Sequence, residues 1–326
     1  MASLIFPEFD AYADAIPGVD GQMRMAGRAV HAWALDSLDL GAVIVLHGRD
    51  GAPVLYQGVN HPDSFGAYFS LPGTETRLNG GDLTDSTFGW FPPGGEIYGH
   101  TRLPARFIAM DLHAPFVRSH AGADERVHKA LGRSAVLPTE RTAVAALMQL
   151  ATRAFAAQQR DPQLFDAAPA REALGLQVLH AVFDCLALTA GPFAGTRRGR
   201  PGFPRQQLIR RSIEYIEACL QGQRQPSDLP LAVGTSARSL HRAFGEAFGV
   251  SPQQYYRLAR LHAIRDQLRA AHQGDTVTAI CARFGVWDFG RLASVYRRLF
   301  GLLPSQELAR AGGLATAEDL RSRMPR

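Results

Sequence analysis

Hydrophobic positions repeat at helical spacing near the end of the chain, and the pattern occurs twice. Each apolar position of the first copy has a matching apolar position 52 residues later. The pairs are Leu240 and Leu292, Ala243 and Val295, Phe244 and Tyr296, and Phe248 and Phe300. Gly249 and Pro252 end the first copy as Gly301 and Pro304 end the second. Apolar side chains three and four residues apart form one stripe of a helix, and glycine followed by proline marks its end. A shorter apolar segment and a glycine turn precede each copy, so the pattern predicts helix-turn-helix units over about 226–249 and 276–301.

The segment between the two units has its own apolar stripe. Tyr255, Leu258, Leu261, Ile264 and Leu268 share one helical face, which predicts a single helix from Pro252 to about residue 271. Such a helix is roughly 30 Å long at 1.5 Å per residue, close to the ~34 Å turn of B-DNA. Two recognition helices held apart by this spacer fit successive major grooves on one side of a duplex, so we expect double-stranded DNA as the partner.

The residues before these units follow different patterns. From about 27 to 118, short alternating or apolar runs are separated by Gly and Pro turns, which indicates an antiparallel β barrel or sandwich, and residues 124–190 show helical periodicity. Residues 191–205 are rich in Gly, Pro and Arg and read as a linker. We therefore predict an α+β chain: a sensing and dimerisation domain over 1–190, the linker, and an all-α DNA-binding domain over 206–326.

Charge is distributed unevenly between these parts. Residues 1–195 hold 14 Lys and Arg against 20 Asp and Glu, a net charge of −6, whereas residues 196–326 hold 21 against 10, a net charge of +11. A basic domain that also contains the repeated helices favours a polyanionic partner. The three cysteines are far apart, and no secretory signal or membrane-spanning run is evident, so we expect a cytoplasmic protein in a reducing compartment.

The outward positions of the first repeated helix hold side chains that can form contacts with DNA bases. With Ser236 as its N-cap and the apolar stripe inward, the candidate DNA-binding residues are Ala237, Arg238, Ser239, His241 and Arg242. The forked guanidinium of arginine pairs with the O6 and N7 edge of guanine, and a small alanine fits against a thymine methyl group.

The second repeated helix has a similar outward side. Asp288 is its expected N-cap, and the candidate residues are Phe289, Gly290, Arg291, Ser294, Arg297 and Arg298. We assign Arg291 to base reading and Arg297 and Arg298 to phosphates, which position a protein without reading sequence. Trp287 is either a core anchor or a DNA contact.

These motifs resemble the DNA-binding domain of the arabinose-regulator (AraC/XylS) family of transcription factors. The resemblance covers about residues 207–310 and rests on residues 234–236, Arg238, Leu240, 242–244, 248–252, Tyr255 and 260–261 in the first half, and on Val277, Ile280, Gly285, 290–291, 296–298, 300–301 and Pro304 in the second. It implies an effector-responsive regulator, an activator that contacts RNA polymerase, and a homodimer formed through the N-terminal half. That half is similar, in outline, to cupin-like β-barrel sensors, and around residues 56–59 and 90–95 to the ethanolamine-utilisation type of regulator.

A barrel sensor places its ligand in the barrel mouth, lined by aromatic side chains with few polar groups. The candidate effector-binding residues are Tyr56, Tyr68, Trp90, Tyr98 and His100, each of which has ordinary core packing as its alternative. The histidines are scattered without a His-x-His pair, and no nucleophile elbow, phosphate loop or dinucleotide fingerprint is present, so we expect no metal, no cofactor and no catalytic residue. Two alternatives stay open: a ligand-independent DNA-binding protein whose N-terminal half only dimerises, and a cupin-type enzyme with an accessory helical domain.

Overall fold

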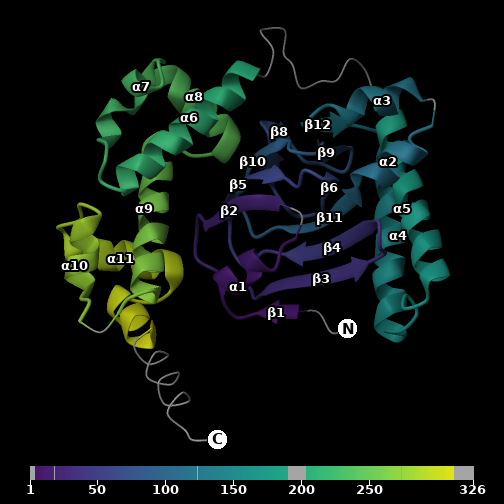
Figure 1. The fold of residues 1–326 in the computed structure, drawn as a ribbon. Coiled ribbons are helices and arrows are strands. Elements are labelled where there is room, and N and C mark those ends of the chain that lie inside the picture. Colours follow the sequence, from purple (N-terminus) through teal and green to yellow (C-terminus); the bar gives the residue numbers. More distant parts are fainter. Residues whose placement is uncertain (1–3, 18, 123, 190–202, 273, 312–326) are drawn as a thin grey trace, which may run out of the picture. The chain divides into compact units, whose positions relative to one another are not determined.

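The chain divides into two compact units. The computed structural model describes residues 4–17, 19–122, 124–189, 203–272 and 274–311. One unit is built mainly from residues 1–204 and the other mainly from residues 205–326. The first combines antiparallel strands with helices and the second is helical (Figure 1), which confirms the predicted fold class. The predicted linker 191–205 lies outside the described residues except for its last three, which begin helix α6 (Phe203–Leu220) instead of continuing the linker.

Two β-sheets form the centre of the first unit. The larger has the order β1 (Leu4–Phe6), β3 (Trp33–Asp39), β4 (Val43–Arg49), β11 (Arg106–His113), β6 (Ser64–Ser70), β9 (Thr87–Phe91) and β12 (Ala135–Pro138). The smaller has the order β2 (Val19–Met25), β5 (Val54–Asn60), β10 (Glu96–Thr101), β7 (Thr76–Leu78) and β8 (Gly81–Asp82). The strand pairs β1 with β3, β5 with β10, β4 with β11 and β6 with β11 are antiparallel, as the turn-punctuated sequence predicts.

Alternating side chains of the larger sheet lie on its two faces, one toward the helices and one toward the smaller sheet. Ile108 and Leu112 of β11 belong to a core shared with the helices, whereas Phe107 and Ala109 line a cavity between the two sheets, and Met110 belongs to the core and also reaches the cavity lining. This division follows from the two-residue period of a strand, in which successive side chains point to opposite faces. One face of the sheet therefore builds the core, and the other builds a candidate ligand site.

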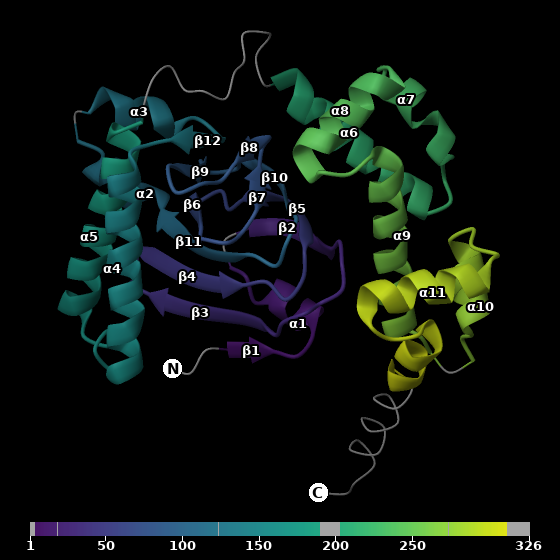
Figure 2. The same ribbon diagram turned by 180° about the vertical axis from the view of Figure 1, so that it is seen from behind.

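Helices cover the core face of the larger sheet. They are α2 (Ala114–His120), α3 (Glu125–Leu131), α4 (Arg141–Arg160) and α5 (Ala168–Ala187), while the short α1 (Phe9–Asp14) packs near β3. The long helices α4 and α5 run side by side, as Figures 1 and 2 both show. In α4, apolar residues such as Leu147, Ala151 and Ala154 are buried at helical spacing. The helical segment predicted over 124–190 is present, and β12 interrupts it.

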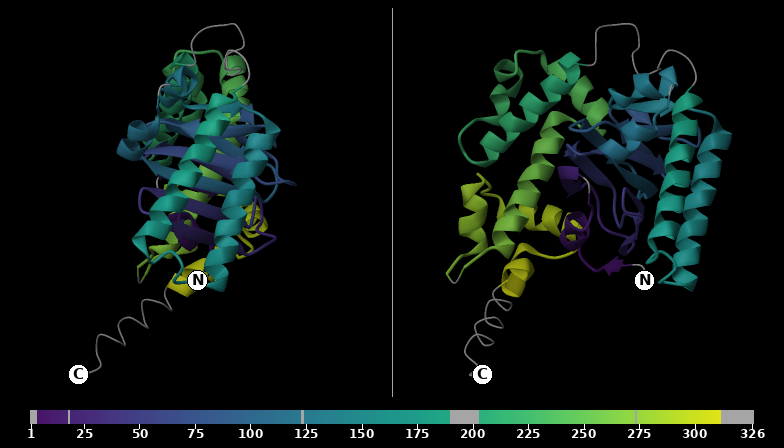
Figure 3. Two further views of the ribbon diagram at one scale, coloured as in Figure 1. Left: turned by 90° about the vertical axis from the view of Figure 1, so that its right-hand side faces the viewer. Right: turned by 45° about the vertical axis from the view of Figure 1, so that its right-hand side comes forward.

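The second unit is organised around α9 (Pro252–Arg269), which extends for about 27 Å at 1.5 Å per residue. The pair formed by α7 (Leu229–Ala232) and α8 (Ala237–Phe248) lies near the start of α9. The pair formed by α10 (Val277–Arg283) and α11 (Phe289–Phe300) lies near its end (Figure 3). A short 3₁₀ turn over Pro226–Asp228 precedes α7, and residues 304–311 form a further helix. The turn residues Gly234 and Gly285 have φ angles of 69° and 68°, a left-handed conformation that favours glycine.

A buried polar cluster fixes the second helix pair to α9. The Tyr296 hydroxyl donates to Glu307 Oε2 at 3.3 Å, and Arg265 Nε lies 3.7 Å from the same oxygen. The Arg265 guanidinium also lies 4.9 Å from the centre of the Phe300 ring. Burial and the neighbouring Glu307 carboxylate raise the pKa of Tyr296, so its hydroxyl keeps its proton and remains a donor. The cluster thus holds α11 in place from the side opposite its exposed arginines.

Candidate functional site

The first candidate recognition helix, α8, presents a basic exposed face. Leu240, Ala243 and Phe244 are buried, and the Phe244 ring meets the Tyr255 ring of α9 edge to face at 5.4 Å. The Ser236 hydroxyl accepts a hydrogen bond from the backbone N–H of Ser239 at 3.2 Å, so the predicted N-cap is present. Ala237, Arg238, His241 and Arg242 are exposed, and Ser239 is half-buried with its hydroxyl bonded to that of Ser236.

The second candidate recognition helix, α11, repeats this arrangement. Leu292, Tyr296 and Leu299 are buried, and Asp288 Oδ1 accepts from the backbone N–H of Arg291 at 3.0 Å as the predicted cap. The predicted contact residues lie on the other side: Gly290, Arg291, Ser294, Arg297 and Arg298 are exposed, and Phe289 is half-buried. The Ser294 hydroxyl donates to the carbonyl oxygen of Gly290 at 3.1 Å, so its oxygen can still accept a hydrogen bond.

The exposed arginines of both helices are available for a polyanion. Within the described residues, Arg238, Arg242, Arg291, Arg297 and Arg298 form no ion pair with a carboxylate. A guanidinium without an internal partner gives up no protein contact when it meets a phosphate or a base. The alternative of a core anchor at Trp287 does not hold, because its side chain is 74% exposed just before α11. A large exposed aromatic residue at this place extends the candidate contact surface.

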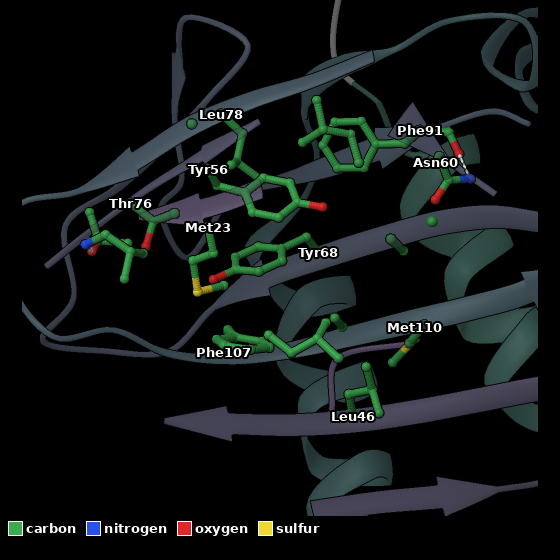
Figure 4. Close-up of a pocket in the computed structure, with 18 of the residues that line it drawn as sticks. Met23, Leu46, Tyr56, Asn60, Tyr68, Thr76, Leu78, Phe91, Phe107 and Met110 are labelled. Atoms are coloured by element: carbon green, nitrogen blue, oxygen red, sulfur yellow. Dashed lines mark hydrogen bonds between the residues drawn. The ribbon is translucent and has the colours of Figure 1, made fainter. Parts of the chain in front are cut away.

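A cavity with about 850 Å³ of empty space, part of it open to solvent, lies between the two sheets of the first unit. Figure 4 shows Tyr56 from one sheet and Tyr68 from the other projecting into it, with Met23, Phe91 and Phe107 around them. Most of the lining is apolar, and the polar lining residues are Asp50, Asn60, Thr76, His100, Thr101 and Asp111 together with the two tyrosines. A concave apolar space with a few polar groups is the usual form of a small-molecule site.

Asp50 is the most unusual of these residues. Its side chain is buried, with the residue 2% exposed, and it accepts a hydrogen bond from the Tyr12 hydroxyl at 2.9 Å. Burial raises the pKa of Asp50 from 3.8 to about 7, although the hydrogen bond from Tyr12 acts in the opposite direction. The carboxyl group therefore changes charge near neutral pH inside a mostly apolar space.

The raised pKa of Asp50 predicts a pH-dependent effect of Asp50→Asn. The folded state keeps the proton between pH 3.8 and about 7 and the unfolded state releases it, so ionisation of Asp50 lowers stability as pH rises through this window. Asn cannot ionise, so we expect Asp50→Asn to unfold a few degrees higher than the unsubstituted protein at about pH 8, with a smaller difference at about pH 5, where only part of this window has been crossed. Calorimetry at the two pH values measures this. If Asp50→Asn instead lowered stability equally at both pH values, ionisation of the Asp50 carboxyl would not destabilise the folded protein.

The structure brings three of the five predicted effector-binding residues together. Tyr56, Tyr68 and His100 line the cavity, whereas Trp90 and Tyr98 are not among its lining residues. Trp90 points to the opposite face of the larger sheet, where its indole N–H donates to the carbonyl oxygen of Ala130 at 3.0 Å. Its ring stacks on Phe65 with centroids 5.3 Å apart. The aromatic residue type did not tell which face of the strand each side chain occupies.

Sequence reasoning missed Asp50, Asn60, Thr76 and Phe107 as lining residues. Asp50 precedes Gly51 at the end of β4 and reads as an ordinary turn residue. Asp111 carried a clearer signal, since it is the one carboxylate in strand β11, it stands among apolar residues, and it lies on the same face as Phe107. A search for single charged residues within predicted apolar strands would have found it.

No group of three or more His, Cys, Asp and Glu side chains among the described residues could hold a metal ion. No helix in the described part of the chain is long and apolar enough to cross a membrane.

Comparison with known proteins identifies the second unit. Residues 231–310 match the family described as a helix-turn-helix domain. The "Probable thc operon regulatory protein" of Rhodococcus erythropolis is 33% identical over 110 residues, 33% of this chain and 32% of the relative. The "XylDLEGF operon transcriptional activator 1" of Pseudomonas putida is 32% identical over 114 residues, 35% of this chain and 33% of the relative. The "HTH-type transcriptional activator RhaS" of Escherichia fergusonii is 37% identical over 71 residues, 22% of this chain and 25% of the relative.

These matches span about a third of the length of the first two relatives, which are regulators and not enzymes by name. They confirm the resemblance to the AraC/XylS family for this third of the chain. A solved structure titled as unsaturated fatty acid bound wild-type ToxT from Vibrio cholerae aligns over 90% of this chain and 95% of its own, with 10% identity and a TM-score of 0.28.

Proposed function

We propose that this chain, whose C-terminal unit carries an AraC-type helix-turn-helix domain, is a sequence-specific DNA-binding transcription activator that responds to a small-molecule effector. The observation that carries the proposal is the pair of capped helices α8 and α11, each with an exposed arginine-bearing face and each attached to the ~27 Å helix α9. This spacing is close to one turn of B-DNA, so α8 and α11 enter neighbouring major grooves.

Within this interface the arginines divide by position. Arg238, His241 and Arg242 of α8 and Arg291 of α11 read base edges, because they lie on the first two turns of each helix, beside small or polar exposed residues. Arg297 and Arg298 lie in the last turn of α11 and contact phosphates. Ala237, Ser239, Phe289, Gly290 and Ser294 complete the contact surface.

The cavity of the first unit is the proposed effector site. Tyr56, Tyr68 and His100 lie in its lining, and its mostly apolar wall suits a small organic molecule. Effector binding changes promoter occupancy or contact with RNA polymerase, and the first unit mediates homodimerisation. The names of the curated relatives, which include transcriptional activators, support the choice of activation.

Mobility shift with a duplex from the promoter beside the gene tests the proposal. We expect retardation at moderate salt that competes poorly with random DNA, and transcription from that promoter that changes with effector. Failure to retard any neighbouring promoter would end the claim of sequence-specific regulation.

The phosphate assignment of Arg298 makes a separate prediction. Arg298→Ala should weaken binding to specific and random duplexes alike and reduce the slope of log affinity against log salt by about one, because one phosphate contact is lost. Titrations at several salt concentrations measure the slope. Arg153→Ala, the same change at an exposed arginine of α4, is the matched control and should leave the slope unchanged. A change in sequence preference without a change in slope would place Arg298 on a base.

A further inference from the structure

The cavity of the first unit carries carboxyl groups but no fixed positive charge. Its titratable lining residues are Asp50, Asp111, His100, Tyr56 and Tyr68, and neither lysine nor arginine is among the lining residues. Asp50 forms no ion pair within the described part of the chain. An anionic ligand would meet two carboxyl groups here and no guanidinium or ammonium, which costs binding energy in a mostly apolar space. The charge of the wall therefore opposes carboxylates and phosphates.

The buried carboxyl of Asp50 lacks the partner that such a group normally has. Buried charges in proteins are ordinarily paired, and Asp50 has the Tyr12 hydroxyl as its side-chain hydrogen-bond donor among the described residues. A ligand cation would supply the missing charge. The aromatic residues Tyr56, Tyr68, Phe91 and Phe107 line the same space, and the faces of aromatic rings attract cations.

A second polar group in the cavity also lacks a partner. The Tyr56 hydroxyl oxygen is buried and has no hydrogen-bond partner in the described structure. Figure 4 shows this hydroxyl pointing into the cavity from the smaller sheet, separated from the Tyr68 hydroxyl. A buried hydroxyl without a partner is costly, and a polar ligand atom would satisfy it.

On the basis of the effector-responsive regulator proposed above, we infer that the effector is an aromatic or apolar amine that carries a second, uncharged polar group. Its ammonium pairs with Asp50, its second polar group bonds to the Tyr56 hydroxyl, and its apolar body lies against Phe91 and Phe107. This assignment deepens the proposed function by fixing the chemical class of the effector.

Three probes with one skeleton test this inference on the full-length protein. Tyramine, tyrosol and 4-hydroxyphenylacetate share a phenol group and differ in carrying an ammonium, an alcohol or a carboxylate. Calorimetric titration should show that tyramine binds most tightly, tyrosol more weakly and the carboxylate not measurably. Tighter binding of the carboxylate than of tyramine would overturn the inference, and so would an absence of tyramine binding at millimolar concentration.

Substitutions identify the groups responsible. Asp50→Asn should weaken tyramine binding by about 10- to 100-fold, because a charge-assisted pair is lost, and leave tyrosol within about twofold. Asp85→Asn removes a carboxylate from an exposed ion pair with Arg141 and serves as the charge-matched control. Tyr56→Phe should fold normally, because its hydroxyl has no protein partner, and weaken all phenol-bearing probes that bind. Unchanged tyramine affinity in Asp50→Asn would refute the pairing.

The pH dependence of binding separates a charge pair from simple packing. Between about pH 6 and pH 8 the Asp50 carboxyl ionises, since burial raises its pKa to about 7, so tyramine affinity should rise while tyrosol affinity stays level. Other titratable groups lie close to Asp50: Tyr12 bonds to it from α1, and the cavity is also lined by Asp111, His100, Tyr56 and Tyr68. The rise in affinity is therefore assigned to Asp50 only if it disappears in Asp50→Asn. A rise that persists in Asp50→Asn would contradict the inference. Promoter retardation is also measured without any probe. If the promoter is retarded but tyramine does not bind, only the inference about the effector fails; if the promoter is not retarded, the proposed function fails as well.

Discussion

Simultaneous replacement of Arg242 and Arg291 by alanine should abolish most sequence preference. Each change removes a guanidinium assigned to a base edge and should cost about 1–3 kcal/mol on the specific site. The two residues lie on separate helices and share no partner, so the losses should add to about 2–6 kcal/mol, which corresponds to a loss of affinity of roughly 30-fold to 20,000-fold. Binding to random DNA should fall much less. Competitive mobility shift with specific and random duplexes measures both quantities.

A matched double variant makes this result interpretable. Arg297→Ala with Arg298→Ala removes the same number of charges from one exposed helix face and should weaken both duplexes equally. Far-ultraviolet circular dichroism should be unchanged in both double variants, because all four side chains are exposed and lack ion pairs within the described residues. Equal losses on specific and random DNA in the Arg242 and Arg291 variant would show that these residues contact phosphates.

Glu307→Ala should strongly destabilise the second unit. Glu307 is 5% exposed and faces Arg265, which is 7% exposed, together with the Tyr296 hydroxyl. Removal of the carboxylate takes away the counter-charge that Glu307 supplies to the buried Arg265 guanidinium, and loss of one partner of a buried ion pair typically costs about 3–5 kcal/mol. Urea unfolding followed by circular dichroism measures the loss.

The control for Glu307→Ala is Glu214→Ala. Glu214 makes an exposed pair with Arg210 one helical turn away, at 3.8 Å, and such surface pairs contribute at most about 1 kcal/mol. Because Glu307 holds α11 through Tyr296, its loss should also weaken DNA binding at the half-site that α11 reads. Comparable stability of the two variants would mean that the cluster of Tyr296, Arg265 and Glu307 contributes little to the fold.

The second unit could be predicted well because its patterns are local. The apolar stripes of α8, α9 and α11, the caps Ser236 and Asp288 and the turn glycines are all set by spacing within a dozen residues. Because the apolar stripe of each helix is buried, the opposite side is exposed, and this side carries the arginines that the sequence indicated. The resemblance to a known family agreed with this local reading.

The first unit was harder because its organisation depends on long-range pairing. The strands β1 and β2 and the helix α1 escaped prediction, since Leu4–Phe6 has only three residues and Val19–Met25 mixes polar residues with a glycine. The cavity depends on register: β11 pairs with β4 and β6 so that Phe107 and Tyr68 face one space and Trp90 faces another. Asp50 reaches that space through a turn, and no periodic signal marks it. Side-chain type alone therefore separated cavity from core poorly.

Hydroxyl-radical footprinting of the protein on its promoter tests the central claim most directly. Two recognition helices attached to one ~27 Å helix should protect two patches on one face of the duplex, centred about one helical turn, or about 10 base pairs, apart for each protomer. Alanine at Arg242 should remove protection from one patch and alanine at Arg291 from the other. A single protected patch that both substitutions weaken, or patches on opposite faces of the duplex, would contradict the account.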